Sequence, residues 1–245
     1  MLSNRSILVT GGSSGIGREL VRRYVAHGAK VMTVARREAE LLKTIAGLDR
    51  QHVFVVPADL GSAKGRHVVA TEAMRLAPID VVVHAAGALG PKAPLGSYPE
   101  DAWHEVLHMN LTSIHLLHQE LVPLLVPTAT IIGLASSVGR KGRRGWGAYA
   151  VSKAALDGWL EVLADEWDGK VYSVNPGGTA TPMRAEAMPE EDPTTIPTPA
   201  DISPIFLRLA AEHVSEDSGA KLNARDFVGT DPWAPVAKDH DTQVG

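Results

Sequence analysis

A glycine-rich turn near the N-terminus is the feature that most restricts the fold of this chain. Residues 6–10 form a short apolar run, residues 11–17 read Gly-Gly-Ser-Ser-Gly-Ile-Gly, and residues 18–27 have helical periodicity. In this order of strand, glycine turn and helix, backbone amides and a helix N-terminus can approach a pyrophosphate, because unpaired N–H groups and the helix dipole favour anions. A second apolar run, residues 30–35, follows at the distance that a βαβ unit requires. The N-terminal segment therefore predicts a dinucleotide-binding unit.

The end of the second predicted strand indicates which dinucleotide would bind. An acidic residue here would accept hydrogen bonds from the ribose 2′-hydroxyl of NAD, but the sequence has Ala35 followed by Arg36 and Arg37. A guanidinium suits a 2′-phosphate, so we expect NADP(H). The alternative is that the arginines are solvated residues that open the next helix, which is more plausible for Arg37 than for Arg36.

Strands and helices then alternate along the chain without a break in composition. The predicted strands are continuously apolar, which indicates a parallel sheet covered by helices on both faces. Asp59 follows the third strand and either accepts a hydrogen bond from an adenine amino group or caps the next helix. The further strands are predicted at residues 53–57, 80–84, 130–135, 171–174 and 219–224, and the further helices at 62–77, 99–126, 147–167 and 200–212.

Composition limits the functional classes. The net charge of -4 gives no electrostatic footprint for nucleic acid. No apolar run reaches the roughly 18 residues that a membrane span needs, and no signal peptide follows the first five residues. The chain has no cysteine, which excludes disulfides and thiolate chemistry. We expect a soluble, cytoplasmic protein with one domain over residues 1–228 and a loose tail over 229–245.

Tyr149 and Lys153 are the strongest catalytic candidates. They lie four residues apart in a predicted helix, so their side chains share a face. A nearby cation favours the phenolate and lowers the pKa of a tyrosine, which would make Tyr149 a usable acid/base at neutral pH. Ser136, at the end of the predicted strand before this helix, has a hydroxyl that can hydrogen-bond a carbonyl oxygen. Taken alone, the Tyr-Lys pair is also compatible with an ordinary helix surface pair.

Polar residues within the predicted helix 99–126 have two interpretations. Asn110 lies in an apolar stretch, where a side-chain amide competes with backbone hydrogen bonds, and we expect a kink nearby. Two of the histidines at positions 104, 108, 115 and 118 have the i, i+4 spacing of metal ligands, but no carboxylate-containing ligand motif accompanies them. We therefore expect no metal site. Residues 179–199 are rich in proline and too long for a simple connection, which indicates a lid or substrate loop.

These motifs together resemble the short-chain dehydrogenase/reductase family over essentially the whole chain. Residues 137–149 and 175–185 further resemble its YciK-like bacterial oxidoreductase branch. The resemblance implies a doubly wound, three-layer Rossmann-type α/β fold with a seven-stranded parallel sheet in the order 3-2-1-4-5-6-7. The motifs that carry it are Thr10-Gly11-x-x-x-Gly15-x-Gly17, Asp59-Leu60, Ala86-Gly87, Asn110, Ser136, Tyr149-x-x-x-Lys153 and Pro176-Gly177.

The resemblance also implies residue roles. Tyr149 would be the catalytic acid/base, Lys153 would lower its pKa and bind the nicotinamide ribose, Ser136 would polarise the carbonyl, and Asn110 would hold a proton-relay water. Ala85 departs from the family, which usually has an asparagine there to brace the sheet and the cofactor edge. The expected cofactor contacts are Gly11, Ser13, Ser14, Gly15, Ile16, Gly17, Arg36, Arg37, Asp59, Leu60, Ala85, Ala86, Gly87, Tyr149, Lys153, Pro176, Gly177, Thr179 and Thr181.

The expected activity is reversible hydride transfer between NADP(H) and a small-molecule carbonyl or alcohol. Two alternatives are a catalytically silent dinucleotide-binding sensor or scaffold, and a nucleotide-sugar epimerase, which the chain length and the glycine spacing disfavour.

A homodimer or homotetramer is expected through residues 110–126 and the helix that carries Tyr149. The apolar residues Trp159, Val162 and Trp167 spread beyond a single stripe of that helix. The alternative is a monomer whose tail covers this surface, with Trp233 as the anchor.

Overall fold

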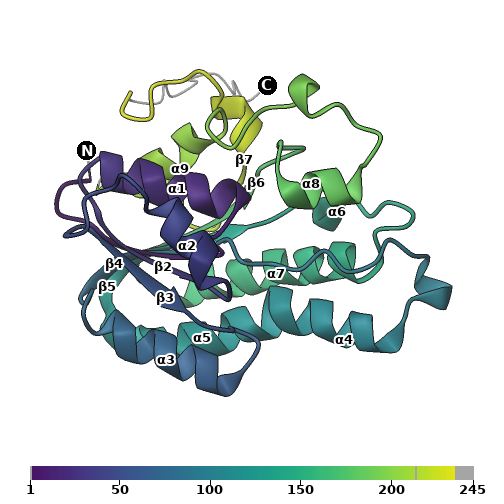
Figure 1. The fold of residues 1–245 in the computed structure, drawn as a ribbon, viewed down its shortest axis with the longest axis horizontal. Helices are drawn as coiled ribbons and strands as arrows, with labels where there is room; N and C mark the ends of the chain where they lie inside the picture. The colour runs from purple at the N-terminus through teal and green to yellow at the C-terminus, as the bar shows by residue number, and fades with distance from the viewer. Residues whose placement is uncertain (1, 213, 235–245) are drawn as a thin grey trace, which may run out of the picture.

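The computed structural model describes residues 2–212 and 214–234 and contains a seven-stranded parallel sheet (Figure 1). The strand order is β3-β2-β1-β4-β5-β6-β7, and each neighbouring pair is parallel. This confirms the predicted fold class and strand order. The strands are β1 (Ser6–Thr10), β2 (Lys30–Ala35), β3 (Val53–Pro57), β4 (Ile79–His84), β5 (Leu125–Leu134), β6 (Lys170–Asn175) and β7 (Lys221–Asn223).

Helices cover both faces of the sheet, which gives three layers. One face is covered by α1 (Gly15–Ala26), α2 (Glu38–Thr44) and α9 (Ser203–Leu209). The other face is covered by α3 (Ala63–Ala73), α5 (Ser113–Leu121) and α7 (Gly147–Glu166), and α4 (Glu100–Leu107) packs against α7. The shorter elements are α6 (Ser137–Arg140), α8 (Pro182–Ala187), the 3₁₀ turns η1 (Leu95–Ser97), η3 (Val122–Leu124), η4 (Pro193–Thr195) and η5 (Ala224–Phe227), and the π-helical turn η2 (His108–Thr112).

The continuous apolar strands follow from this two-sided burial. In β1, Ile7 and Val9 are buried with α1 and α9, whereas Leu8 between them is buried with the helices of the opposite face. Successive side chains of a strand point to opposite faces, so both faces of a central parallel strand need apolar residues. The result is one hydrophobic cluster on each side of the sheet.

One expectation about the C-terminal half is corrected, and the structure adds detail to another. The last helix, predicted over 200–212, is α9, which begins only at Ser203 because Asp201 Oδ2 accepts hydrogen bonds from the Thr198 amide and hydroxyl and holds a separate turn. The predicted loop 179–199 contains the helix α8 and the turn η4, so it is partly structured. Thr181 caps α8 by accepting a hydrogen bond from the Arg184 amide.

The middle of the chain also needs a correction, because the helix predicted over 99–126 ends with α5 at Leu121, and β5, predicted at 130–135, already begins at Leu125 after the turn at Pro123. The predicted kink near Asn110 is the π turn η2 between α4 and α5. Within residues 2–212 and 214–234, no helix is long and apolar enough to cross a membrane. Most of the predicted tail, residues 235–245, lies outside the described part of the chain.

Candidate active site

A cleft of about 500 Å³ lies at the carboxyl edge of the sheet. Its wall includes every residue that the sequence predicted to contact a cofactor, together with Ser136. These residues follow β1, β2, β3, β4, β5 and β6, because parallel strands bring their carboxyl ends to one edge. Ligands bind at such an edge where the strand order reverses, here between β1 and β4.

The glycine turn forms the floor at one end of the cleft. A Cβ atom on Gly11 would lie 2.7 Å from the Ala86 amide nitrogen, and one on Gly17 would lie 2.5 Å from the Gly11 carbonyl oxygen. Gly11 also has a φ of +75°, which disfavours any other residue. Ser14 is the N-cap of α1, and its side chain makes no capping hydrogen bond. The first amides of α1 are therefore available to an anion at this turn.

Thr10 joins this turn to the segment after β4. Its Oγ1 accepts hydrogen bonds from the amides of Ala85 and Ala86, each at 3.1 Å, and donates to the Val83 carbonyl oxygen at 3.4 Å. Thr10 therefore braces the chain after β4, although Ala85 stands where the family usually has an asparagine.

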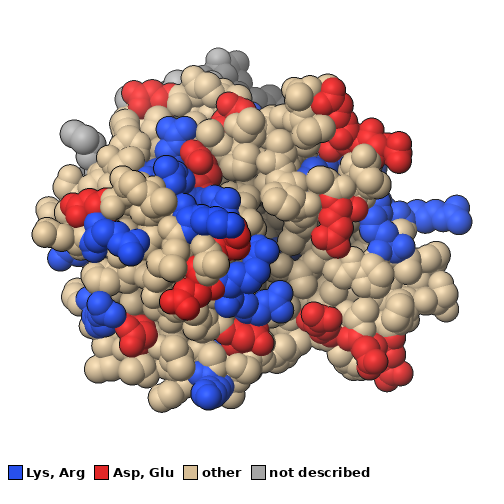
Figure 2. Space-filling view, viewed as in Figure 1, with Lys and Arg blue, Asp and Glu red and all other residues tan. Residues whose placement is uncertain are grey.

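Basic side chains gather over α1 and α2, beside the far end of the cleft (Figure 2). Arg18 is paired with Glu40 at 2.8 Å. Arg36 and Arg37 are exposed, line the cleft, and make no side-chain hydrogen bond or ion pair with the described residues. The end of β2 therefore presents two uncommitted cations where the sequence predicted a 2′-phosphate.

Asp59 occupies the edge after β3 but does not cap α3. The N-cap is Ser62, whose Oγ accepts a hydrogen bond from the Gly65 amide at 3.0 Å. Asp59 Oδ1 accepts from the Gly61 amide at 3.1 Å in a local turn. The capping alternative is therefore wrong, and the carboxylate lies in the cleft wall.

The structure brings Ser136, Tyr149 and Lys153 together at the other end of the cleft. Ser136 is the N-cap of α6, and the other two lie in the first two turns of α7. Lys153 Nζ donates to the Leu134 carbonyl oxygen at 2.7 Å and lies 5.8 Å from the centroid of the Tyr149 ring. One phenol, one hydroxyl and one ammonium thus converge from two neighbouring elements.

Burial has the largest effect on the pKa values of Lys153 and Tyr149. It lowers the pKa of Lys153 to about 8, and the carboxylate of Asp157 opposes that shift. It also raises the pKa of Tyr149, and a hydrogen bond with Ser136 opposes that shift. The predicted net lowering of the pKa of Tyr149 is wrong for this structure, because desolvation of the phenolate outweighs the opposing hydrogen bond while the Lys153 ammonium is bonded to Leu134. That the Lys153 ammonium favours the phenolate form stays a prediction.

Asn110 lies next to this group but does not line the cleft. Its side chain is fully buried; Oδ1 accepts from the Ala88 amide at 2.7 Å, and Nδ2 donates to the Ala88 carbonyl oxygen and to Ser152 Oγ, both at 2.9 Å. The amide therefore fastens the segment after β4 to α7. This explains a polar side chain in an apolar stretch, and Ser152 is a partner that the sequence had not indicated.

Apolar side chains and the short helix α8 form the open side of the cleft. Leu89, Trp146, Met183 and Ala187 lie in its wall. Lys92 Nζ lies 4.7 Å from the centroid of the Trp146 ring and donates to the Ala187 carbonyl oxygen at 2.9 Å. The side next to Tyr149 and Ser136 can thus receive an apolar group that carries a carbonyl.

The histidines of α4, η2 and α5 have separate partners. His108 Nε2 lies 2.7 Å from the Gly61 carbonyl oxygen, His115 Nδ1 accepts from Trp159 Nε1 at 3.3 Å, and His118 packs edge-on against the same Trp159 ring. Within residues 2–212 and 214–234, no group of three or more histidine, aspartate or glutamate side chains could hold a metal ion.

Comparison with known proteins identifies relatives of the whole chain. The family model for short chain dehydrogenases matches residues 5–192. The uncharacterized oxidoreductase YciK of Escherichia coli (strain K12) is 37% identical over 235 residues, which cover 92% of this chain and 93% of YciK. A short chain dehydrogenase from Shigella flexneri 2a str. 301 complexed with NADP is 37% identical with a TM-score of 0.85, over 91% of this chain and 98% of the other. One from Escherichia coli CFT073 complexed with NADPH gives the same values.

The geometry of Asn110 predicts a specific loss of stability. Asn110→Ala removes the partner of the half-buried Ala88 amide and carbonyl, so the free energy of unfolding should fall by about 1–3 kcal/mol. Denaturant unfolding followed by circular dichroism measures the change. Ser113→Ala is the control, because Ser113 Oγ bonds only Met109, through its carbonyl oxygen and Sδ, one helical turn away. Equal losses in the two variants would contradict a bracing role.

Proposed function

This chain belongs to the short-chain dehydrogenase/reductase family, and from that premise we propose that it is an NADP(H)-dependent oxidoreductase acting on a small-molecule carbonyl or secondary alcohol. The observation that carries the proposal is that one cleft contains the glycine turn, the uncommitted arginines after β2, and the group of Ser136, Tyr149 and Lys153. We also propose that the protein is cytoplasmic, because a reaction that uses NADPH fits that compartment.

The cleft has the chemistry that NADP(H) requires. The first amides of α1 would hold the pyrophosphate, and Arg36, with Arg37 beside it, would bind the 2′-phosphate through charge-assisted hydrogen bonds. Lys153 and the turn at Gly177 lie where the nicotinamide end would reach. When bound, the cofactor supplies or accepts the hydride at the nicotinamide ring.

The protein residues would supply binding and proton transfer to the substrate. Ser136 and Tyr149 would donate hydrogen bonds to the carbonyl oxygen, so that negative charge developing there is stabilised. As the carbonyl carbon gains the hydride, the oxygen takes the phenolic proton of Tyr149, and the product is an alcohol. The Lys153 ammonium would stabilise the resulting phenolate. Because this requires the charged form of Lys153, activity should be favoured below the pKa of Lys153, which is about 8.

A silent sensor of the same fold is the alternative from another class. A sensor needs only the glycine turn and the arginines, and cofactor binding alone does not require a buried lysine beside a half-buried tyrosine. NADPH oxidation tests the proposal directly when it is followed at 340 nm with a panel of aldehydes, ketones and diketones that includes 4-nitrobenzaldehyde and 2,3-butanedione. Turnover supports an oxidoreductase; NADPH binding without turnover of any carbonyl supports the sensor.

Replacing the proton donor should separate chemistry from binding. Tyr149→Phe should lower kcat by about 10²–10⁴-fold, because the phenolic proton is lost, while NADPH affinity stays within a few-fold. Stopped-flow rates and nicotinamide fluorescence measure the two quantities. Tyr172→Phe is the control, since it removes a phenol that bonds the Glu216 carbonyl oxygen away from the cleft. More than about a tenth of wild-type activity in Tyr149→Phe would refute the assigned role.

Replacing the first arginine should separate the two dinucleotides. Arg36→Ala should weaken NADPH by about 1.5–3 kcal/mol and leave NADH nearly unchanged, because only NADPH carries the 2′-phosphate. Titration calorimetry with both cofactors measures the difference. Arg50→Ala, which removes an exposed cation outside the cleft wall, should affect neither. Equal losses for NADPH and NADH would indicate a structural arginine.

We propose that the protein is a homodimer or homotetramer paired through α5 and α7. The support is exposed apolar surface on α7 and directly after α5: Val162 in α7 is 57% exposed, and Val122 in η3 is 40% exposed. Trp159 contributes less than the sequence suggested, because its ring packs against the His84 ring and Nε1 donates to His115. Trp233 packs edge-on against His27 beside α1, across the sheet from α7, so it does not anchor a cover for this surface.

The assembly can be tested at its most exposed residue. Light scattering at micromolar concentration should give a mass of two or four chains for the wild type, and Val162→Glu should reduce it because a charge is placed in an apolar contact. Lys64→Glu on α3 is a control for surface charge. A monodisperse wild-type mass near 26 kDa would refute the oligomer.

A further inference from the structure

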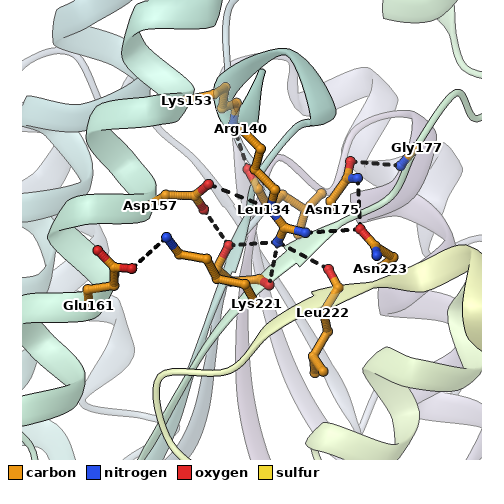
Figure 3. Close-up of polar contacts among 11 residues, drawn as sticks. Leu134, Arg140, Lys153, Asp157, Glu161, Asn175, Gly177, Lys221, Leu222 and Asn223 are labelled. Atoms are coloured by element: carbon orange, nitrogen blue, oxygen red, sulfur yellow. Dashed lines mark hydrogen bonds and ion pairs between the residues drawn. The ribbon is translucent and has the colours of Figure 1, made fainter. Parts of the chain in front are cut away.

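We propose that Arg140 and Asp157 form a positioning pair that fixes Ser136, Lys153 and the turn at Gly177 relative to one another for hydride and proton transfer. The inference rests on the proposed function and adds residues that do not touch the substrate. Both side chains lie behind the cleft and are absent from its wall. Figure 3 shows them between α7 and strands β6 and β7.

Arg140 connects the serine-bearing turn to two strands. It is the last residue of α6, whose N-cap is Ser136. Its Nη2 lies 3.2 Å from the carbonyl oxygens of both Ser173 in β6 and Leu222 in β7, and its Nη1 donates to Asn223 Oδ1 at 2.9 Å (Figure 3). A planar guanidinium can make several bonds in fixed directions, so it sets the orientation of α6 as well as its distance.

Asp157 connects the lysine-bearing helix to the same place. It lies one turn after Lys153 in α7, and its side chain is 7% exposed. Its Oδ2 lies 3.7 Å from Arg140 Nε, and its Oδ1 accepts a hydrogen bond from the Ser173 hydroxyl. The carboxylate thus ties α7 to α6 and β6 at once.

A third arm reaches the turn after β6. Asn223 Oδ1, which accepts from Arg140, also accepts from Asn175 Nδ2 at 3.1 Å. Asn175 Oδ1 in turn accepts from the Gly177 amide at 3.0 Å (Figure 3). Two side chains, those of Asn223 and Asn175, therefore connect Arg140 to the turn that would face the nicotinamide.

The packing of α6 on α7 shows why such a pair is useful. A Cβ on Gly139 would lie 2.7 Å from the Lys153 carbonyl carbon, so α6 touches the helix backbone at the catalytic turn. A shift of α6 would change the distance between Ser136 and Lys153 directly. A buried ion pair contributes little net stability compared with well-packed apolar residues, so fixing this geometry is the stronger reason for its presence.

The charges around Lys153 make the pair visible in a pH profile. The carboxylate of Asp157 faces it from α7, the guanidinium of Arg140 lies beyond that carboxylate on α6, and the phenol of Tyr149 lies on its other side. From β5 it meets the neutral carbonyl of Leu134, and from η2 the neutral amide of Asn110 lies nearby. Asp157 is therefore the carboxylate that favours the charged form of Lys153.

Two variants separate geometry from charge. Arg140→Lys keeps the positive charge but cannot reach the same set of acceptors, so kcat should fall by about 10- to 100-fold, as expected for small misplacements of reacting groups. The alkaline limb of its pH profile should stay in place. Asp157→Asn keeps the shape but loses the charge that raises the pKa of Lys153, so its alkaline limb should move to lower pH. In both variants the NADPH dissociation constant should change by less than about threefold, because phosphate binding is untouched.

The experiment uses the full-length protein with NADPH and 4-nitrobenzaldehyde, or the carbonyl of the panel that is reduced fastest. Glu161→Gln is the matched control: it removes the exposed ion pair of Glu161 with Lys221, which also joins α7 to β7 (Figure 3), and should change neither kcat nor the pH profile. Asn223→Ala is the variant to use if the others do not fold, because it removes the shared acceptor from an exposed position; its kcat should fall while NADPH binding is retained.

The outcomes distinguish this inference from the proposed function. No turnover in the wild type would overturn both. Turnover in the wild type with more than half of kcat kept in Arg140→Lys, or in Asn223→Ala if that is the variant that folds, would overturn the positioning pair alone. A lower melting temperature in Asp157→Asn with an unmoved pH profile would also overturn it, because that is the result of a purely structural role.

Discussion

All seven strands of the sheet run in the same direction, and the site depends on this constraint. Each crossover returns through a helix, so every strand delivers its last residue to the same edge. The winding reverses between β1 and β4, and there the glycine turn and the segment after β4 approach each other closely. The Thr10 hydroxyl joins them, and the absence of a side chain on Gly11 makes the approach possible.

Burial is the second condition for the chemistry. A lysine in contact with water would stay charged far above neutral pH and would interact weakly with a phenol. Lys153 is instead 4% exposed, with the Leu134 carbonyl oxygen as its hydrogen-bond acceptor and Asp157 one turn away. The low-dielectric surroundings strengthen every interaction that it makes, and they also make its protonation sensitive to one carboxylate.

Local patterns in the sequence were sufficient for most of the strands and helices, and the family resemblance supplied the expected cofactor contacts of the cleft. Strand order followed from the family resemblance, and the convergence of Tyr149 with Lys153 followed from their spacing. Asp157 and Arg140 were not found, because their partners in β6 and β7 are distant in sequence and no local rule connects them. The i+4 spacing of Asp157 from Lys153 was the available signal, but an aspartate in a helix is usually a solvated residue. The start of α9 was missed for a different, local reason, since a turn made by Thr198 and Asp201 competes with the helix.

The rim of the cleft is held by weaker interactions than its floor. The floor is fixed by buried contacts, such as those of Asn110 and Thr10, whose loss leaves polar groups unpaired. The rim helix α8 is joined to the opposite side through Lys92, which is exposed and contributes a hydrogen bond to the Ala187 carbonyl oxygen, a weak one to Met188 Sδ, and a cation–π contact. An exposed cation–π contact is worth only about 0.5–1 kcal/mol. The link through Lys92 is therefore a weak constraint on α8, which borders the side where the apolar wall would receive a substrate.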